Sequence, residues 1–195
     1  MSEASSRPGP HPAAGTVATR LIWVLALLVA DLASKSAVFA WIGGLRERGE
    51  LTLHECGLLS HPRYPLVGDW LSFMLTLNPG AAFGQLGDYP YLLIGGRVVA
   101  VLFLLWLLVR TPSQRPITVT ALVLVLSGAL GNLYDNLFLD DPHDGHPFGK
   151  VRDFIDVYFA AFDWHFPTFN VADSCITVGA VLLLYTSLFG KESSS

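Results

Sequence analysis

Four long apolar runs dominate the pattern of hydrophobic and polar positions along this chain. They cover about residues 21–42, 91–109, 117–136 and 171–189. A helix needs about 20 predominantly apolar residues to cross the hydrocarbon core of a bilayer, and each run is close to that length. The pattern therefore predicts four transmembrane helices.

The segments between the runs contain shorter patterns. Residues 51–54 and 71–77 alternate apolar and polar side chains, which is the period of a strand with one buried face. The second stretch leads directly into Asn78-Pro79-Gly80-Ala81-Ala82-Phe83-Gly84. Small residues of this kind allow a close approach of the backbone to a ligand, although a plain turn is the simpler interpretation.

Composition supports a membrane protein. The 195 residues are 52% hydrophobic and 14% charged, with a mean hydropathy of +0.48, which is too apolar for an ordinary soluble domain. Residues 1–20 are rich in Ser, Pro, Ala and Gly, so we expect a disordered cytoplasmic tail before one membrane-embedded domain at 21–190. Residues 191–195 form a second short tail.

Basic residues are denser in the two tails and in the short loop 110–116 than in the two long segments between the runs. The positive-inside rule therefore places both termini in the cytoplasm and the long segments outside. The chain has no basic footprint for nucleic acid.

Several polar residues lie within the apolar runs, where a charge costs roughly 2.5–3.5 kcal/mol on insertion scales. Asp31 and Lys35 are spaced i, i+4, so they either form a self-neutralising pair or belong to a site. An Asn-x-x-Asp spacing occurs twice, at the end of the third run and at the start of the fourth. Arg97, in the second run, is expected to extend toward the membrane surface.

Threading the runs with the N-terminus inside places these polar residues together, near the outer membrane boundary. A zinc protease is excluded because His54-Glu55 lacks a second histidine ligand, and Ser127-Gly128 lacks the leading glycine of a rhomboid-like site. Two carboxylates that share one proton can hydrolyse an amide without a metal. Three acids compete for the two positions: Asp135, Asp153 and Asp173.

At these residues the chain resembles signal peptidase II, the bacterial prolipoprotein signal peptidase, over most of residues 21–190. The resemblance is carried by five short motifs in order: Asp31-x-x-x-Lys35, Asn78-x-Gly80-Ala81-Ala82-Phe83, Gly128-x-x-Gly131-Asn132-x-x-Asp135, Val151-x-Asp153-Phe154 and Phe169-Asn170-x-Ala172-Asp173-Ser174.

The resemblance implies an α-helical membrane protein, with a four-transmembrane-helix bundle, a small extracytoplasmic β-cradle and a short outer helix. It implies an aspartic endopeptidase whose catalytic dyad is Asp153 and Asp173, with Asp135 structural. Residues that orient the dyad or hold substrate would be Asp31, Lys35, Asn78, Gly80, Gly128, Asn132, Asn170 and Ala172. It implies no cofactor.

The implied substrates are diacylglyceryl-modified prolipoproteins, cut before the lipobox cysteine by an enzyme of the bacterial inner membrane. We expect a monomer surrounded by membrane lipids, with its active site toward the outer face. The sequence departs from the family at Asn136, where an arginine is usual, and Arg152 is a candidate replacement. Segments 43–70 and 138–150 are longer than the family norm and have no assigned role.

Two other functions compete with this interpretation. A presenilin-like aspartyl protease is prompted by Tyr134-Asp135, but Gln85 replaces the first glycine of the Gly-x-Gly-Asp motif that ends at Asp88. A small transporter could use Asp31, Asp135 and Asp173 as a proton or cation path. The acidic patch at 140–146 is interpreted as a solvated loop, because its spacing matches no metal template.

Overall fold

The computed structural model describes residues 14–56, 59–79, 86, 88–139 and 148–189. Its helices are α1 (Ala14–Glu47), α2 (Pro90–Arg110), α3 (Pro116–Phe138) and α4 (Val171–Phe189). Each is long and apolar enough to cross a membrane, which confirms the four predicted helices. Gly80 and the acidic patch at 140–146 lie outside the described residues.

The first helix is longer than its apolar run at both ends. Residues 14–20, predicted to belong to the disordered tail, form its first turns, and it continues past the predicted end at residue 42 to Glu47. With 34 residues it is about 51 Å long, well beyond the roughly 30 Å hydrocarbon core. Hydropathy alone missed these extensions because both are stabilised by tertiary contacts.

Arg20 stabilises the beginning of α1. Its guanidinium is buried and donates from Nη1 to the carbonyl oxygens of Leu108 and Thr111, at 2.6 and 2.8 Å. These carbonyls belong to the C-terminal end of α2, where backbone acceptors lack helical partners and the helix dipole favours a cation. Arg20 therefore connects the two helices rather than marking a disordered tail.

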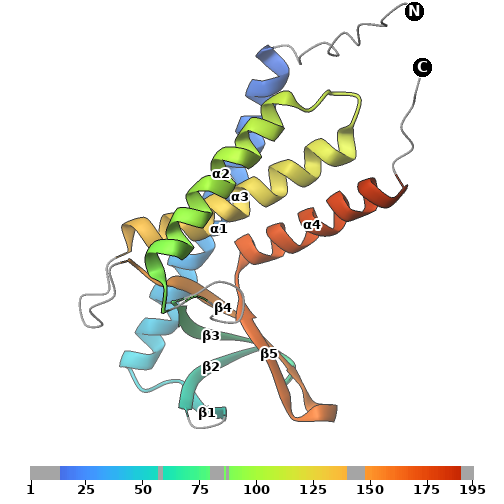
Figure 1. Cartoon of the computed structure of the whole chain (residues 1–195). Coiled ribbons are helices and arrows are strands. Elements are labelled where there is room, and N and C mark those ends of the chain that lie inside the picture. The colour runs from blue at the N-terminus through green and yellow to red at the C-terminus, as the bar shows by residue number, and fades with distance from the viewer. Residues whose placement is uncertain (1–13, 57–58, 80–85, 87, 140–147, 190–195) are drawn as a thin grey trace, which may run out of the picture.

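A five-stranded antiparallel sheet lies at one end of the helices (Figure 1). Its strands, in spatial order, are β1 (Thr52–Cys56), β2 (Leu59–Val67), β3 (Leu71–Asn78), β4 (Val151–Phe159) and β5 (Trp164–Phe169). The two predicted strands correspond to β1 and β3, which confirms the small sheet. The segment 43–70, which had no assigned role, supplies the end of α1 and the two strands at one edge.

The other strands were missed because they lack clean alternation. In β4, the adjacent residues Asp153 and Phe154 are both buried, since both faces of the strand are covered there. Within the described part of the segment after α3, the only helical turn is the 3₁₀ turn Ala160–Phe162. The short outer helix implied by the family resemblance is therefore not found among these residues.

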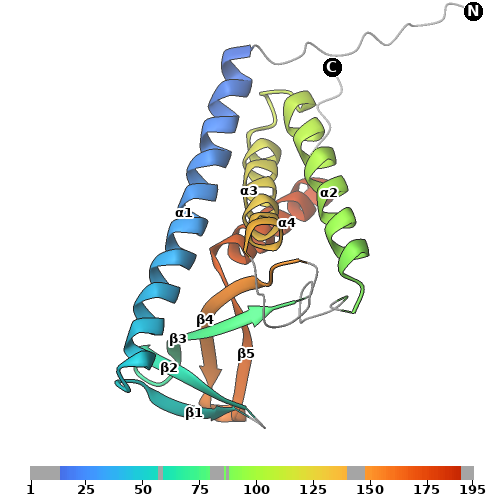
Figure 2. The same ribbon diagram turned by 90° about the vertical axis from the view of Figure 1, so that its left-hand side faces the viewer.

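The sheet packs against the C-terminal part of α1 (Figure 2). Val38 and Ile42 are buried with Phe154, and Phe73 meets Phe154 edge-on at 5.6 Å between ring centroids. Trp41 extends this contact to Tyr64 on β2. Leu45, which lies beyond the apolar run, also packs against this cluster, and this contact explains why α1 continues past residue 42.

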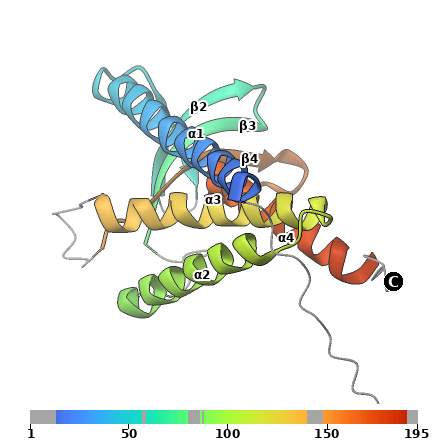
Figure 3. The same cartoon turned by 90° about the horizontal axis from the view of Figure 1, so that it is seen from above.

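Helix α3 contacts each of the other three helices and lies between them when the molecule is viewed from above (Figure 3). Its approach to α4 depends on glycine, because a Cβ atom at Gly128 would collide with the backbone carbonyl oxygen of Ala172. A Cβ at Gly179 would lie 2.8 Å from the carbonyl oxygen of Ala121. The small residues thus set the spacing of the two helices, as is common within membranes.

Gly128→Ala is expected to destabilise the protein by about 1–3 kcal/mol, because the added methyl group must push α4 away from α3. Gly95→Ala is the matched control, since a Cβ atom at Gly95 on α2 meets nothing within 4 Å. Thermal unfolding of the two purified variants in detergent checks the difference. Equal unfolding temperatures would contradict the close packing at Gly128.

Candidate active site

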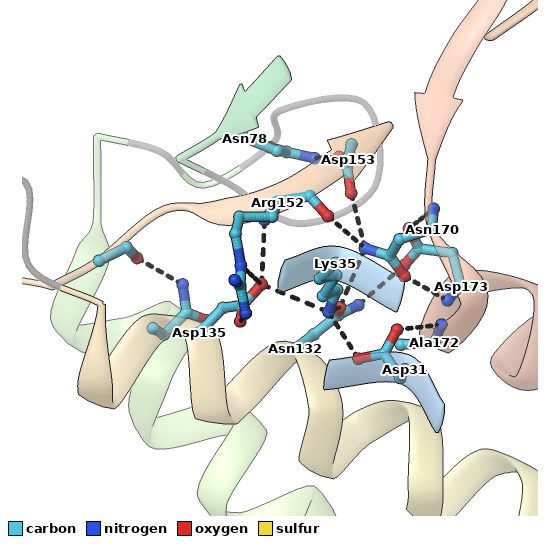
Figure 4. A network of polar contacts seen from close by, with 12 residues as sticks. Asp31, Lys35, Asn78, Asn132, Asp135, Arg152, Asp153, Asn170, Ala172 and Asp173 are labelled. Carbon is cyan, nitrogen blue, oxygen red and sulfur yellow. Dashed lines mark hydrogen bonds and ion pairs between the residues drawn. The ribbon is translucent and has the colours of Figure 1, made fainter. Parts of the chain in front are cut away.

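A fully buried lysine on α1 is the centre of a polar network at the sheet end of the helices (Figure 4). Lys35 Nζ lies 2.8 Å from Asp31 Oδ2, 3.0 Å from Asn132 Oδ1 and 3.3 Å from Asp135 Oδ2. An ammonium group has three donors, so all of them have an acceptor. Asp31 and Lys35 are therefore part of a larger network, rather than an isolated pair that only assists insertion.

Asp135 connects this lysine to the sheet. Its carboxylate is fully buried and also accepts from Arg152, from the backbone N–H at 3.0 Å and from Nη2 at 2.8 Å. Arg152 additionally donates to Ser36 Oγ at 3.1 Å. With both oxygens occupied by two cations, Asp135 connects the start of β4 to α1 and α3.

The start of α4 is a capping box formed by Asn170 and Asp173. Asn170 Oδ1 accepts from the backbone N–H of Asp173 at 2.9 Å, and Asp173 Oδ2 accepts from the backbone N–H of Asn170 at 3.2 Å. This reciprocal pattern satisfies two N–H groups that a helix start leaves without partners. The Asn-x-x-Asp spacing therefore has a local structural reason as well as a possible chemical one.

The same asparagine also binds the other candidate acid. Asn170 Nδ2 donates to Asp153 Oδ1 at 2.6 Å, and Asn78 Nδ2 on β3 donates to Asp153 Oδ2 at 3.2 Å. Asn132 Nδ2 donates to Asp173 Oδ1 at 2.8 Å. Asp153 from β4 and Asp173 from α4 are thus both held by one residue, Asn170, although they are distant in the sequence.

The two central amides have defined orientations. Lys35 can only donate, so the group of Asn132 that faces it must be the oxygen, and its amide nitrogen then faces Asp173. In Asn170 the oxygen accepts a backbone N–H, which leaves its nitrogen to donate to Asp153. The buried lysine thereby determines, through Asn132, which group is presented to Asp173.

The two acids have different electrostatic environments. Burial, together with the neighbouring charge of Asp173, raises the pKa of Asp153 from 3.8 to about 7, against the opposing effect of its two asparagine donors. Asp173 accepts two hydrogen bonds at the N-terminus of α4, where the helix dipole stabilises an anion. Near neutral pH Asp153 can therefore still carry a proton.

Ala172 and Gly128, the last two supporting candidates, lie where α4 contacts α1 and α3. Ala172 is buried, and its backbone N–H donates to Asp31 Oδ1 at 2.8 Å. Gly128 packs against the carbonyl oxygen of the same residue. Apart from Gly80, the structure therefore brings every predicted site residue into one cluster or into direct contact with it.

Two residues near the cluster were not found from the sequence as site residues. Thr76 pairs directly with Asp153 across β3 and β4, and its buried hydroxyl has no hydrogen-bond partner among the described residues. Arg97 does not extend to the membrane surface as expected, because its guanidinium donates to Asn136 Oδ1. Only the strand pairing and the helix packing reveal these neighbours.

Another buried carboxylate on β4 is distinguished from Asp153 by its partners. Asp156 accepts from Arg63 Nε at 2.9 Å and lies 2.8 Å from His165 Nδ1. Both of its oxygens are therefore engaged within the sheet, away from Asn170. Among the described residues, no group of His, Cys, Asp and Glu is arranged to hold a metal ion.

Known proteins share long stretches of this sequence. A family model for signal peptidase (SPase) II matches residues 23–189. A lipoprotein signal peptidase of Teredinibacter turnerae is 40% identical over 142 residues, which cover 69% of this chain and 76% of that protein. One from Polynucleobacter necessarius is 35% identical over 135 residues, covering 65% and 74% of the two chains.

The fold is also shared with a solved bacterial membrane enzyme, at a TM-score of 0.66 and 21% identity over 95% of this chain and 96% of that one. The family match is to a peptidase, which disfavours the transporter, and signal peptidase II is distinct from the presenilin-like alternative. The resemblance drawn from five short motifs is confirmed, and this chain belongs to the signal peptidase II family.

Proposed function

We propose that this protein is an aspartic endopeptidase that removes signal peptides from bacterial prolipoproteins, cutting before the diacylglyceryl-modified cysteine. Family membership supports the substrate class. The observation that carries the chemistry is the binding of both Asp153 and Asp173 by Asn170, in a buried site where the pKa of Asp153 is raised to about 7. Such a pair titrates as a unit and shares one proton at neutral pH.

In the proposed mechanism Asp173 is the base and Asp153 the acid. The carboxylate of Asp173 takes a proton from a water molecule, whose oxygen attacks the carbonyl carbon of the scissile bond. Asp153 donates its proton to the carbonyl oxygen, which gives a neutral tetrahedral intermediate. The C–N bond then breaks as Asp173 protonates the leaving nitrogen, and Asp153 recovers its proton from the intermediate's hydroxyl group.

The surrounding residues orient this pair. Asn132 and Asn170 each hold a carboxylate in a fixed direction, and Lys35 holds Asn132. Asn78 is placed to orient Asp153 and to contact substrate, because it donates to the Oδ2 atom from β3. We retain Gly80 as a substrate-binding position on the basis of its motif alone.

For the membrane arrangement, we propose a multi-pass protein of the bacterial inner membrane with both termini in the cytoplasm. The sheet and the dyad would then lie toward the outer face, where a lipid-anchored precursor could enter the site from the bilayer. Residues 14–189 would form a single peptidase unit, monomeric and surrounded by lipid. The partners would be diacylglyceryl-modified prolipoproteins, with no nucleic acid and no cofactor.

A cleavage assay tests the proposed activity. The full chain, reconstituted in liposomes, is incubated with a precursor peptide that carries diacylglycerol on its lipobox cysteine, and the products are identified by mass spectrometry. We expect a single cut before the modified cysteine, and little cleavage of the same peptide without lipid. Failure to cut the lipidated peptide, with the protein folded, would contradict the proposal.

The pH dependence follows from the proton on Asp153. Because the pKa of this carboxyl is raised to about 7, the acid form is present below that pH and is lost above it. We therefore expect kcat/KM to fall on the alkaline side with an apparent pKa near 7, by about tenfold for each further pH unit. A substrate without groups that ionise near neutral pH is used for the measurement, and a flat profile from about pH 6 to 9 would refute the assignment.

A further inference from the structure

Arg97 is an unusual residue in α2. Apart from Arg110 at its C-terminal end, Arg97 is the only charged residue in this helix, and it lies about two turns after Pro90. A charge inside a membrane-length helix is costly and marks a functional position when it faces the protein interior. Arg97 is only partly exposed and donates from Nη1 to Asn136 Oδ1 on α3.

Asn136 is an anchor for this guanidinium. Asn136 is buried, and its side-chain amide nitrogen donates to the backbone carbonyl oxygen of Gly149 at 2.7 Å. The backbone N–H of Gly149 donates in turn to the backbone carbonyl oxygen of Asn136 at 2.9 Å. The amide oxygen is consequently directed to Arg97. A Cβ atom at position 149 would collide with the backbone carbonyl oxygen of Leu139, so the close approach of Gly149 to the end of α3 requires glycine.

Asn136 and Asn132 are spaced i, i+4 on α3, so they lie on the same face about 6 Å apart along the helix. Asn132 is the residue that donates to Asp173. Arg97 therefore approaches the dyad along the same helix face, one turn away. Its charge interacts electrostatically with Asp173, Asp153 and Asp135.

The charges around the dyad show what this cation contributes. The dyad consists of Asp153 on β4 and Asp173 on α4. The described ionisable groups around it are Asp31 and Lys35 on α1, Arg97 on α2, Asp135 on α3 and Arg152 on β4. Four carboxyl groups thus meet three cations, and one shared proton leaves the cluster neutral. Without Arg97, a second proton would be needed for the same balance.

We propose that Arg97, held in place by Asn136, is a positioning residue that keeps the dyad singly protonated at neutral pH. This inference rests on the proposed aspartic mechanism. A nearby cation stabilises the ionised form of a carboxylate, so its removal makes both protons of the dyad harder to lose. The pair would then remain doubly protonated, and inactive, at a pH where the normal enzyme is active.

The test is the pH profile of kcat for Arg97→Gln, measured with the full chain in liposomes. We expect the whole profile to move to higher pH by on the order of one unit, with the maximal rate reduced less than about tenfold. Combining Arg97→Asn with Asn136→Arg moves the guanidinium onto α3, and is expected to return the profile to its original position. Arg110→Gln is the control, because Arg110 packs over Trp106 at the other end of α2.

A profile that stays in place, or a rate that falls equally at every pH, would overturn this role for Arg97. So would an exchange variant that leaves the profile displaced. If Arg97→Gln does not fold, Asn136→Ser is measured instead, because it removes the acceptor on α3 without removing the charge of Arg97. It should displace the profile in the same direction, and an unmoved profile would again overturn the inference.

The proposed function is tested separately by Asp173→Asn, which should be inactive at every pH. If Asp173→Asn is inactive and the Arg97→Gln profile is unmoved, only the role of Arg97 fails. If Asp173→Asn remains active, the aspartic mechanism itself fails.

Discussion

Asp153→Asn and Asp173→Asn are each expected to reduce the cleavage of a diacylglyceryl-modified precursor by about 10³-fold or more. Asparagine has nearly the same shape as aspartate and can still accept a hydrogen bond, so the fold should persist. It can neither take a proton from water nor donate one to a carbonyl group. Initial rates in liposomes measure the activity, and unfolding temperatures in detergent show that the variants are folded.

Asp163→Asn is the matched control for this pair. Asp163 is an exposed residue at the turn before β5 and has a φ of 46°, a left-handed conformation that asparagine also tolerates. The control carries the same chemical change outside the cluster, so it should cleave at the normal rate. Appreciable cleavage by either dyad variant would show that the two acids are not the reacting groups.

Lys35→Met is expected to cause the largest loss of stability, about 3–5 kcal/mol, because it leaves buried carboxylates without their shared cation. Lys35 is completely buried and contacts Asp31, Asn132 and Asp135. Its loss also frees Asn132 to rotate away from Asp173, so the activity of the folded fraction should fall by about 10²-fold. Thermal unfolding and cleavage rates on the same samples separate the two effects.

Two further variants test this explanation. Arg48→Ala removes an ion pair with Glu50 in which both side chains are more than half exposed, and should leave the unfolding temperature unchanged. Adding Asp31→Asn to Lys35→Met should recover part of the lost stability, because it removes one of the unpaired charges and keeps an acceptor for the Ala172 N–H. If the double variant is less stable than Lys35→Met alone, the unpaired charge is not the cause.

The helices were predictable because each one is apolar over about the length that is needed to cross a bilayer. The ends of α1 were not predictable in this way, because they depend on tertiary contacts. Arg20 contacts the end of α2, and Leu45 packs against the cluster between α1 and the sheet. In the sheet, the first half of β3 alternates buried and less buried positions, whereas β4 is covered on both faces at Asp153 and Phe154. Pattern analysis detects the first kind of strand and misses the second.

The site was predictable for a different reason. Charged and amide side chains are rare in membrane-length runs, so Asp31, Lys35, Asn132 and Asp173 stood out against their surroundings. Residue patterns alone could not choose among three acids, since that choice depends on pairing. In the structure Asp135 is neutralised by two cations, whereas Asn170 holds both Asp153 and Asp173.

Arg97 illustrates what the sequence could not provide. A lone arginine close to the beginning of an apolar run resembles the many arginines that extend toward a membrane surface. Its partner, Asn136, is 39 residues away in the chain. Only the packing of α2 on α3 brings the two together. The departure at Asn136 was visible from the sequence, but the cation that reaches it was not.

The capping box at Asn170 and Asp173 couples the folding of α4 to the geometry of the proposed site. The same hydrogen bonds begin the last helix and hold one proposed catalytic carboxylate, so unwinding a single turn would dismantle both. The geometry of the proposed dyad therefore requires that the first turn of α4 be formed.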